Sequence, residues 1–211
     1  MSTKVITGAK CRSSYMFVND LELRGKKATT KTVKSAILIP KSDKKTIKAI
    51  REAIDAAATA SFGKTFKEYS TSYNHPLRDG DKELEMREED EDGEAGVEGA
   101  EYENCYFVNC TGYKVPDVVD SSASLMEDWD ERKEVCTSGN YFRFSITAKG
   151  YENESKGVRF LLNNLMFIKE GERLDGGKKG EDDFAEYADV EDDDEVINDK
   201  PKKKKRLKRK R

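Results

Sequence analysis

The sequence predicts a compact α+β or β-barrel domain over residues 1–175, mainly β with one helix, and a charged tail over residues 176–211. About five segments are rich in β-branched and aromatic residues, and a single amphipathic helical segment follows the second of them. These two observations predict the domain. Toward the C-terminus charge is dense and apolar residues are few, which is typical of a disordered segment.

The expected strands are apolar and aromatic segments bounded by turn residues. They cover residues 4–18, 33–39, 104–110, 138–151 and 155–171, with a short extended piece within 113–120. Turn residues at 153–157 separate the last two strands, so the sequence predicts a hairpin there.

The expected helix follows the segment VKSAILIP, where the apolar period changes. Ser42 or Asp43 can cap its start, and Gly63 is a plausible stop. Its apolar face, which we expect to pack on a sheet, carries Ile47, Ile50 and Ile54. The insert over 83–103 is acidic, contains glycines and has few apolar residues, so we expect a long, mobile surface loop.

The net charge of −3 hides a strong asymmetry along the chain. Residues 1–74 carry +9, residues 75–110 carry −10, residues 181–199 carry −11 and residues 200–211 carry +10. The sequence pI near 5.5 therefore says little about partners. The N-terminal third is basic enough to meet a polyanion.

Composition also limits where the protein acts. No run of about 18 apolar residues occurs, so we expect no membrane span. The N-terminus lacks the apolar stretch of a signal peptide, and the four cysteines show no CxxC spacing. We therefore expect free thiols in a reducing cytoplasm.

The strand over 140–149 presents two different faces. Phe142, Phe144, Ile146 and Ala148 form a core face, and the other face carries Tyr141, Arg143, Ser145 and Thr147. In the first strand Arg12 similarly lies near Tyr15 and Phe17. Single-stranded nucleic acid needs such pairs, because bases stack on rings while cations track phosphates. Each aromatic residue taken alone is more often part of a core.

Catalytic signals are weak, and we expect a protein that is not an enzyme and holds no metal. No HExxH, GxSxG or Walker loop is present, and the one histidine, His75, precedes a proline. Asp79 and Asp81 could hold a divalent cation, but Asp-Gly is more often turn chemistry.

The ordered segments ILIPKSD followed by a helix, then PLRDGD, YFVNC, VPDVVD, SGNYFRFSITAKGY, KGVRFLLNN and EDDFAE resemble a family of tailed-phage proteins. The resemblance covers residues 4–187. It implies a five-stranded OB-fold-like barrel that binds single-stranded DNA without sequence preference in phage replication and recombination. It further implies action in the host cytoplasm without a cofactor. The acidic insert over 83–103 is longer than the family pattern, and the basic end after Pro201 lies outside it.

The match assigns DNA contacts by position in this sequence. The candidate DNA-binding residues are Arg12, Tyr15, Lys34, Arg78, Lys114, Tyr141, Arg143 and Lys149. The residue pattern itself favours Tyr15, Tyr141 and Arg143 most.

The end of the chain carries a run of acidic residues that is followed directly by a run of basic residues. Single-strand binders often end in an acidic tail with an aromatic tip, and Asp182, Asp183, Phe184 and Tyr187 fit that description as a partner-binding tail for replication or recombination proteins. The basic end over 202–211 could neutralise the acidic run, add a second phosphate-binding arm, act as a nuclear address or simply solubilise the chain.

Two other functions stay open on the sequence alone. A strand-annealing recombination protein would also accelerate pairing of complementary strands. A phage structural or assembly protein would contact DNA through its tail without preferring single strands. A nuclease ranks third, since only Asp79 and Asp81 begin a carboxylate cluster. Homodimerisation is a further open expectation.

Overall fold

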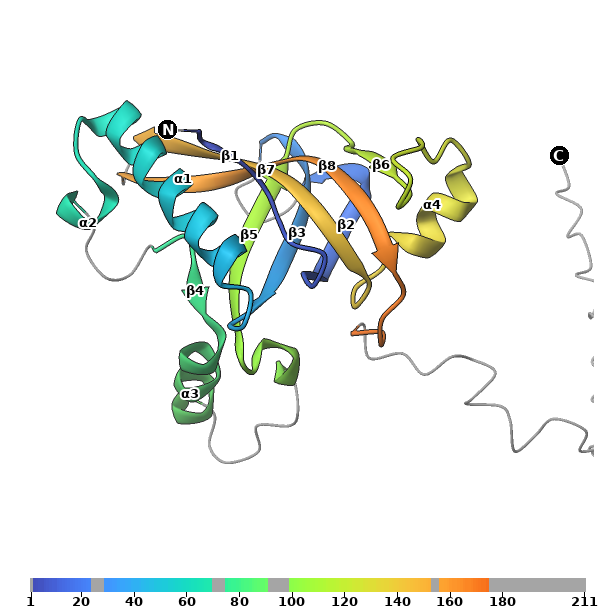
Figure 1. The fold of residues 1–211 in the computed structure, drawn as a ribbon, viewed down its shortest axis with the longest axis horizontal. Coiled ribbons are helices and arrows are strands. Elements are labelled where there is room, and N and C mark those ends of the chain that lie inside the picture. The colour runs from blue at the N-terminus through green and yellow to red at the C-terminus, as the bar shows by residue number, and fades with distance from the viewer. Residues whose placement is uncertain (1, 24–28, 70–74, 91–98, 153–155, 175–211) are drawn as a thin grey trace, which may run out of the picture. The chain divides into compact units, whose positions relative to one another are not determined.

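The computed structural model describes residues 2–23, 29–69, 75–90, 99–152 and 156–174 (Figure 1). One compact unit spans Met1–Gly177. The strands are β1 (Lys4–Ile6), β2 (Arg12–Leu23), β3 (Lys31–Pro40), β4 (Arg78–Asp79), β5 (Cys105–Gly112), β6 (Asp117–Val119), β7 (Tyr141–Glu152) and β8 (Lys156–Lys169). The helices are α1 (Lys44–Phe62), α2 (Phe66–Tyr69), α3 (Gly80–Asp90), the 3-10 turn η2 (Ala100–Tyr102) and α4 (Trp129–Val135).

Five strands pair into a closed ring in the order β2, β3, β5, β8 and β7, with β7 returning to β2. The β5–β8 pairing is parallel, and the other four are antiparallel. A ring of five strands is the arrangement of an OB fold, so the predicted OB-like architecture is confirmed. The predicted hairpin is also present, since β7 and β8 pair from Tyr141 opposite Lys169 to Glu152 opposite Lys156.

The predicted helix α1 supplies one wall of the core. The Asp43 side chain accepts a hydrogen bond from the Thr46 backbone nitrogen (3.1 Å), and Gly63 ends the helix with φ 70°. The buried face, which includes Ile47, Ile50 and Ile54, packs against β1, β7 and β8. This apolar contact fixes the helix to the ring.

The predicted core face of β7 is confirmed. Phe142, Phe144 and Ile146 are fully buried, and Ala148 is nearly so. They belong to the main hydrophobic cluster together with the apolar face of α1. The side chains between them on β7 are partly or fully exposed, which leaves the outer face of the strand available for contacts.

The predicted single strand over residues 4–18 is wrong in detail. Residues 4–6 form β1, which pairs with β7, and β2 begins only at Arg12. The chain turns between them, where Gly8 lies against Asp43 at the start of α1. The Gly8 backbone nitrogen donates to Thr46 Oγ1 (2.8 Å), so this turn is tied to the helix.

The acidic insert is not one long loop, because Gly80–Asp90 forms the helix α3. Glu, Lys, Leu and Met are good helix formers, and their propensity outweighed the low hydropathy that suggested a loop. Tyr102 of η2 packs edge-on against Phe107 with ring centroids 4.8 Å apart, and both join Leu38 in a second, smaller apolar cluster. Together with α2 and α4, these elements exceed the one helix that the sequence predicted.

Lys41 ties the end of β3 to the start of α3. Its Nζ lies 2.7 Å from Asp79 Oδ1 and 2.6 Å from Asp81 Oδ2. The Asn104 backbone nitrogen donates to Asp81 Oδ1 (2.7 Å). The Lys41 hydrogen bond lowers the pKa of Asp81, with the Asn104 hydrogen bond as the next cause. These two carboxylates thus serve a structural contact with a cation of the chain itself.

The expectation of free thiols is confirmed. All four cysteines are free thiols, and three of them are buried. Among the helices of the described part of the chain, none is long and apolar enough to cross a membrane.

Candidate nucleic-acid interface

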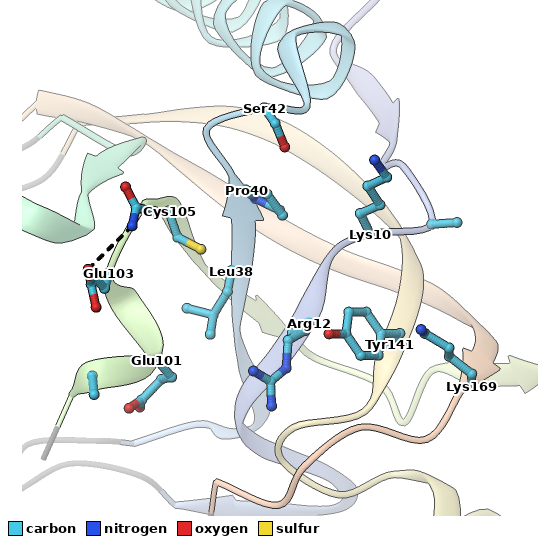
Figure 2. Close-up of a pocket in the computed structure, with 13 residues that line it drawn as sticks. Lys10, Arg12, Leu38, Pro40, Ser42, Glu101, Glu103, Cys105, Tyr141 and Lys169 are labelled. Carbon is cyan, nitrogen blue, oxygen red and sulfur yellow. Dashed lines mark hydrogen bonds between the residues drawn. The ribbon is translucent and has the colours of Figure 1, made fainter. Parts of the chain in front are cut away.

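A groove with a volume of about 490 Å³ lies where β2 meets the start of β7 (Figure 2). Figure 2 shows Arg12, Tyr141 and Lys169 on one side of it and Glu101 and Glu103 on the other. Its lining residues are Ala9, Lys10, Arg12, Leu38, Pro40, Ser42, Ala100, Glu101, Glu103, Asn104, Cys105, Tyr141 and Lys169. The groove therefore has a cationic wall with an aromatic ring and an opposite wall that contains two carboxylates.

Two cations, one from β2 and one from β8, lie near the aromatic ring of Tyr141. The Arg12 guanidinium lies 5.5 Å and the Lys169 ammonium 4.7 Å from the centroid of its ring. Arg12 is anchored, because its Nε donates to the Gly139 carbonyl (3.0 Å) and its Nη2 to the Glu172 carbonyl (2.8 Å). Lys169 is exposed at the end of β8, so its ammonium is the more easily displaced of the two cations.

Strand β2 bulges at Tyr15, beyond the groove. Its φ is 47°, a left-handed conformation that a bulky side chain rarely adopts. The Met16 backbone nitrogen donates to Ser138 Oγ (3.1 Å), and the Gly139 backbone nitrogen donates to the Ser13 carbonyl (2.8 Å). These contacts hold the bulge, which leaves Tyr15 55% exposed.

The outer side of β2 carries a row of aromatic and cationic side chains. Beyond Arg12 and Tyr15 comes Phe17, which is 45% exposed. Lys34 of β3 pairs directly with Phe17 and is also exposed. We name Arg12, Tyr15, Phe17, Lys34 and Tyr141 the β2 row. It brings three aromatic rings and two cations together on β2 and its two neighbouring strands, β3 and β7.

The other predicted residues lie outside this row. Arg143 is exposed, and its Nη1 donates to the Thr7 carbonyl (3.3 Å), toward β1. Lys149 stands near the far end of β7, opposite Arg159 of β8. Lys114 is exposed just after β5.

Arg78 is engaged within the protein. Its guanidinium forms an ion pair with Glu83 and lies 4.9 Å from the centroid of the Phe107 ring. It therefore holds the start of α3 against β5. The predicted tail residues Asp182, Asp183, Phe184 and Tyr187 lie outside the described residues.

Sequence reasoning missed part of the groove. Lys10 lies in the turn before β2 and Lys169 at the end of β8. Only the hairpin register, with Tyr141 opposite Lys169, could have pointed to the second of them. Glu101 and Glu103 come from the acidic insert, and no pattern in its sequence indicates which part of the domain it packs against. Trp129 and Arg132 of α4 were also missed, since the sequence predicted no helix there.

Cys105 is the one thiol among the groove-lining residues, and it is half-buried. Burial raises its pKa, with the nearby Asp81 charge as the next cause. Burial raises the pKa of Cys11 to about 12, that of Cys110 to about 12 and that of Cys136 to about 11. None of the four thiols is activated as a nucleophile.

Comparisons with known proteins give the family and the fold. The chain is 30% identical over 146 residues to protein p50 of Acyrthosiphon pisum secondary endosymbiont phage 1, a match that covers 66% of this chain and 70% of that protein. The solved structure of the single-stranded DNA-binding protein from bacteriophage Enc34 in complex with single-stranded DNA superimposes with a TM-score of 0.63 at 19% identity, and the match covers 81% of this chain and 88% of that chain.

A second solved structure shares the fold more distantly. It is gp2.5, a single-stranded DNA-binding protein encoded by bacteriophage T7, with a TM-score of 0.50 at 16% identity over 93% of this chain and 99% of that chain. The family model described as Enterobacter phage Enc34, ssDNA-binding protein matches residues 3–197. By this match over nearly its whole length, the chain belongs to the family of the Enc34 phage single-stranded DNA-binding protein.

Proposed function

We propose that this protein binds single-stranded DNA without sequence preference during phage DNA replication and recombination, in the cytoplasm of the host. Family membership and the OB-like ring support the proposal. The observation that carries it is the β2 row, where the exposed rings of Tyr15 and Phe17 lie near cations and the row reaches the groove at Arg12 and Tyr141.

The mechanism is stacking combined with charge neutralisation. Bases that are free of a complementary strand stack on Tyr141, Tyr15 and Phe17, at about 1–3 kcal/mol for each stacked base. Arg12, Lys34 and Lys169 neutralise phosphates between the rings. A duplex hides the faces of its bases, so only the charge contribution would act on it. No covalent bond forms or breaks, and the protein is not an enzyme in this proposal.

Two carboxylates in the groove reduce its electrostatic attraction for phosphate groups. Glu101 and Glu103 face the cationic wall, so a phosphate chain is attracted to one side and repelled from the other. This arrangement favours a strand whose bases point at Tyr141 and whose phosphates follow Arg12 and Lys169.

The test is fluorescence anisotropy with labelled oligo-dT and with a duplex of equal length, at two salt concentrations. Full-length protein and protein without residues 176–211 are compared. We expect tight binding to oligo-dT that survives removal of the tail, and much weaker binding to the duplex. Equal binding to both DNAs that vanishes with the tail would contradict the proposal, because the basic end would then be the DNA contact.

The same material separates the rival functions. A strand-annealing protein would accelerate pairing of two complementary labelled strands, whereas a protein that only coats single strands slows it. An assembly protein would bind both DNA forms alike. The predicted acidic tail, with Phe184 and Tyr187 as its aromatic residues, remains a proposal for binding replication or recombination proteins. A homodimer is tested by light scattering on the same samples.

A further inference from the structure

Arg132 of α4 is a buried cation with no counter-ion among the described residues. It is only 6% exposed. Its Nε donates to Asn19 Oδ1 of β2 (3.4 Å), and its buried Nη2 has no hydrogen-bond partner. Among the residues that the structure describes, no carboxylate forms an ion pair with it. Burying an unpaired charge is costly, so the site attracts an anion.

The neighbouring carboxylate of Asp128 is already committed. It caps α4 by accepting hydrogen bonds from the backbone nitrogens of Asp130 (2.8 Å) and Glu131 (3.1 Å). Asp130 and Glu131 are exposed. Within the part of the chain that the structure describes, the charge of Arg132 thus has no counter-ion where α4 meets β2.

Trp129 stands over this buried charge. The Arg132 guanidinium lies 5.3 Å and the Lys133 ammonium 5.7 Å from its ring. Helical spacing places these three residues on one face of α4. Trp129 is 41% exposed, so part of an electron-rich ring backed by two cations is open to a ligand. An aromatic ring beside cations suits a nucleotide, which brings both a base and a phosphate.

The α4 face continues the β2 row. Asn19, which contacts Arg132, follows Phe17 on the outward side of β2. Figure 1 shows α4 beside β2, as this contact requires. From Arg12 to Asn19 the strand extends about 23 Å at about 3.3 Å per residue. A single strand that leaves the groove along β2 would therefore reach α4.

We propose that α4 forms a second subsite for the same DNA strand, in which a base stacks on Trp129 and the adjoining phosphate supplies the counter-anion that Arg132 lacks. Lys133, which is exposed, contributes to holding that phosphate. This inference rests on the proposed function and extends it, because it sets the path and the length of the bound strand.

Intrinsic fluorescence tests the subsite directly, because Trp129 is the only tryptophan of the chain. Full-length protein is titrated with oligo-dT of about 4 and about 12 nucleotides, within the range of site sizes seen for OB folds. Anisotropy of a labelled oligonucleotide reports binding in parallel. We expect both lengths to bind and only the longer one to quench Trp129, through base stacking.

Three variants sharpen the test. Trp129→Ala should weaken binding of the longer oligonucleotide about tenfold and leave the shorter one unchanged. Lys133→Ala should reduce the slope of log K against log salt by about 0.7, the value for one lost phosphate contact on a single strand. The control Tyr113→Ala removes an exposed ring that belongs neither to the β2 row nor to α4 and should change neither.

Arg132→Met distinguishes a binding role from a structural one. Replacing an unpaired buried charge by an apolar side chain of similar size should keep or raise the melting temperature of the free protein. The same change should weaken binding of the longer oligonucleotide. A lower melting temperature with unchanged affinity would overturn the subsite and make Arg132 a packing residue.

Different results would contradict the α4 subsite and the proposed single-strand binding. Saturation by anisotropy with the longer oligonucleotide, without quenching of Trp129 and without loss of affinity in Trp129→Ala, would remove the subsite and keep the single-strand function. Absence of any anisotropy change with either length would instead remove the proposed function itself.

Discussion

Tyr141 shows how one residue can serve both the fold and a ligand. It starts β7, pairs with Arg12 of β2 and closes the ring of strands. Its ring is neighboured by an anchored cation, Arg12, and an exposed one, Lys169. When a base takes the place of Lys169 over the ring, that ammonium becomes free to follow a phosphate. Arg12 would keep its backbone hydrogen bonds, and Lys169 would exchange its contact with the ring for one with a phosphate.

Removing this ring should affect binding far more than folding. Tyr141→Ala should weaken oligo-dT binding about tenfold, because each stacked base contributes about 1–3 kcal/mol. Tyr141→Phe should bind nearly as well, since stacking needs the ring and not the hydroxyl. Anisotropy titrations measure both, with Tyr113→Ala as the control for loss of an exposed tyrosine. Equal losses in Tyr141→Ala and Tyr113→Ala would contradict a specific role for the groove.

A thiol in the groove provides an independent reporter. Cys105 lines the groove and is half-buried, whereas Cys11, Cys110 and Cys136 are buried, and burial raises the pKa of all four thiols. A thiol reagent at neutral pH should therefore modify Cys105 first, and saturating oligo-dT should slow that reaction. Mass spectrometry of digested protein identifies the labelled residue. Labelling of Cys105 at an unchanged rate in the complex would show that DNA does not occupy the groove.

At the scale of elements, the bulge in β2 turns a strand into a binding surface. A regular strand would not set Tyr15 in a left-handed conformation, and such strain costs about 1–3 kcal/mol. Hydrogen bonds from the segment before β7 hold it in place. This backbone strain at Tyr15 lowers the stability of the folded protein, so its presence suggests that the exposed ring has a function.

Tyr15→Gly separates the two effects. Glycine adopts a positive φ without strain, so the free energy of unfolding should stay the same or rise by about 1 kcal/mol. Affinity for oligo-dT should fall about tenfold with the loss of the ring. Denaturant melts and anisotropy measure the two quantities. Tyr15→Ala is the matched comparison and should be less stable than Tyr15→Gly. A clear loss of stability in Tyr15→Gly would mean that the ring supports the fold.

The contact of Lys41 with Asp81 predicts a dependence of stability on pH. The pKa of Asp81 is lowered in the folded protein by its hydrogen bonds with Lys41 and the Asn104 backbone. Its contribution is therefore fully present above the ordinary pKa of 3.8 and is lost as pH falls through the lowered value. Asp81→Asn should lower the melting temperature at neutral pH, and the gap to the unmodified protein should shrink in strong acid. A gap that widens in acid would contradict this assignment.

The elements also show where sequence patterns suffice. The apolar faces of α1 and β7 were predictable, because burial imposes their periods of 3.6 and 2 residues. Helix α3 was not, since its acidic residues fold against only a small apolar cluster around Leu38, Tyr102 and Phe107. Tyr15, Tyr141 and Arg12 were foreseen individually. Their proximity to Lys169 depends on the strand register, and their proximity to the α4 residues depends on where a short helix packs. Tertiary packing sets both.

For the whole molecule, charge is divided along the chain rather than balanced locally. Residues 1–74 carry a net charge of +9 and supply most of the β2 row, whereas residues 75–110 carry −10 and include the acidic wall of the groove. Binding to a polyanion should therefore weaken steeply with salt, while stacking should be much less sensitive. This contrast lets salt titrations separate the cations of the row from its rings.

The most direct measurement of the central claim is photocrosslinking of the full-length protein to oligo-dT that contains 5-iododeoxyuridine, followed by mass spectrometry of the crosslinked peptides. Crosslinks form where a base lies against an aromatic side chain. We expect crosslinks to Tyr15, Phe17 and Tyr141. Crosslinks confined to residues outside the β2 row, or restricted to the segment after Pro201, would contradict this expectation, because the bases would then not lie along β2.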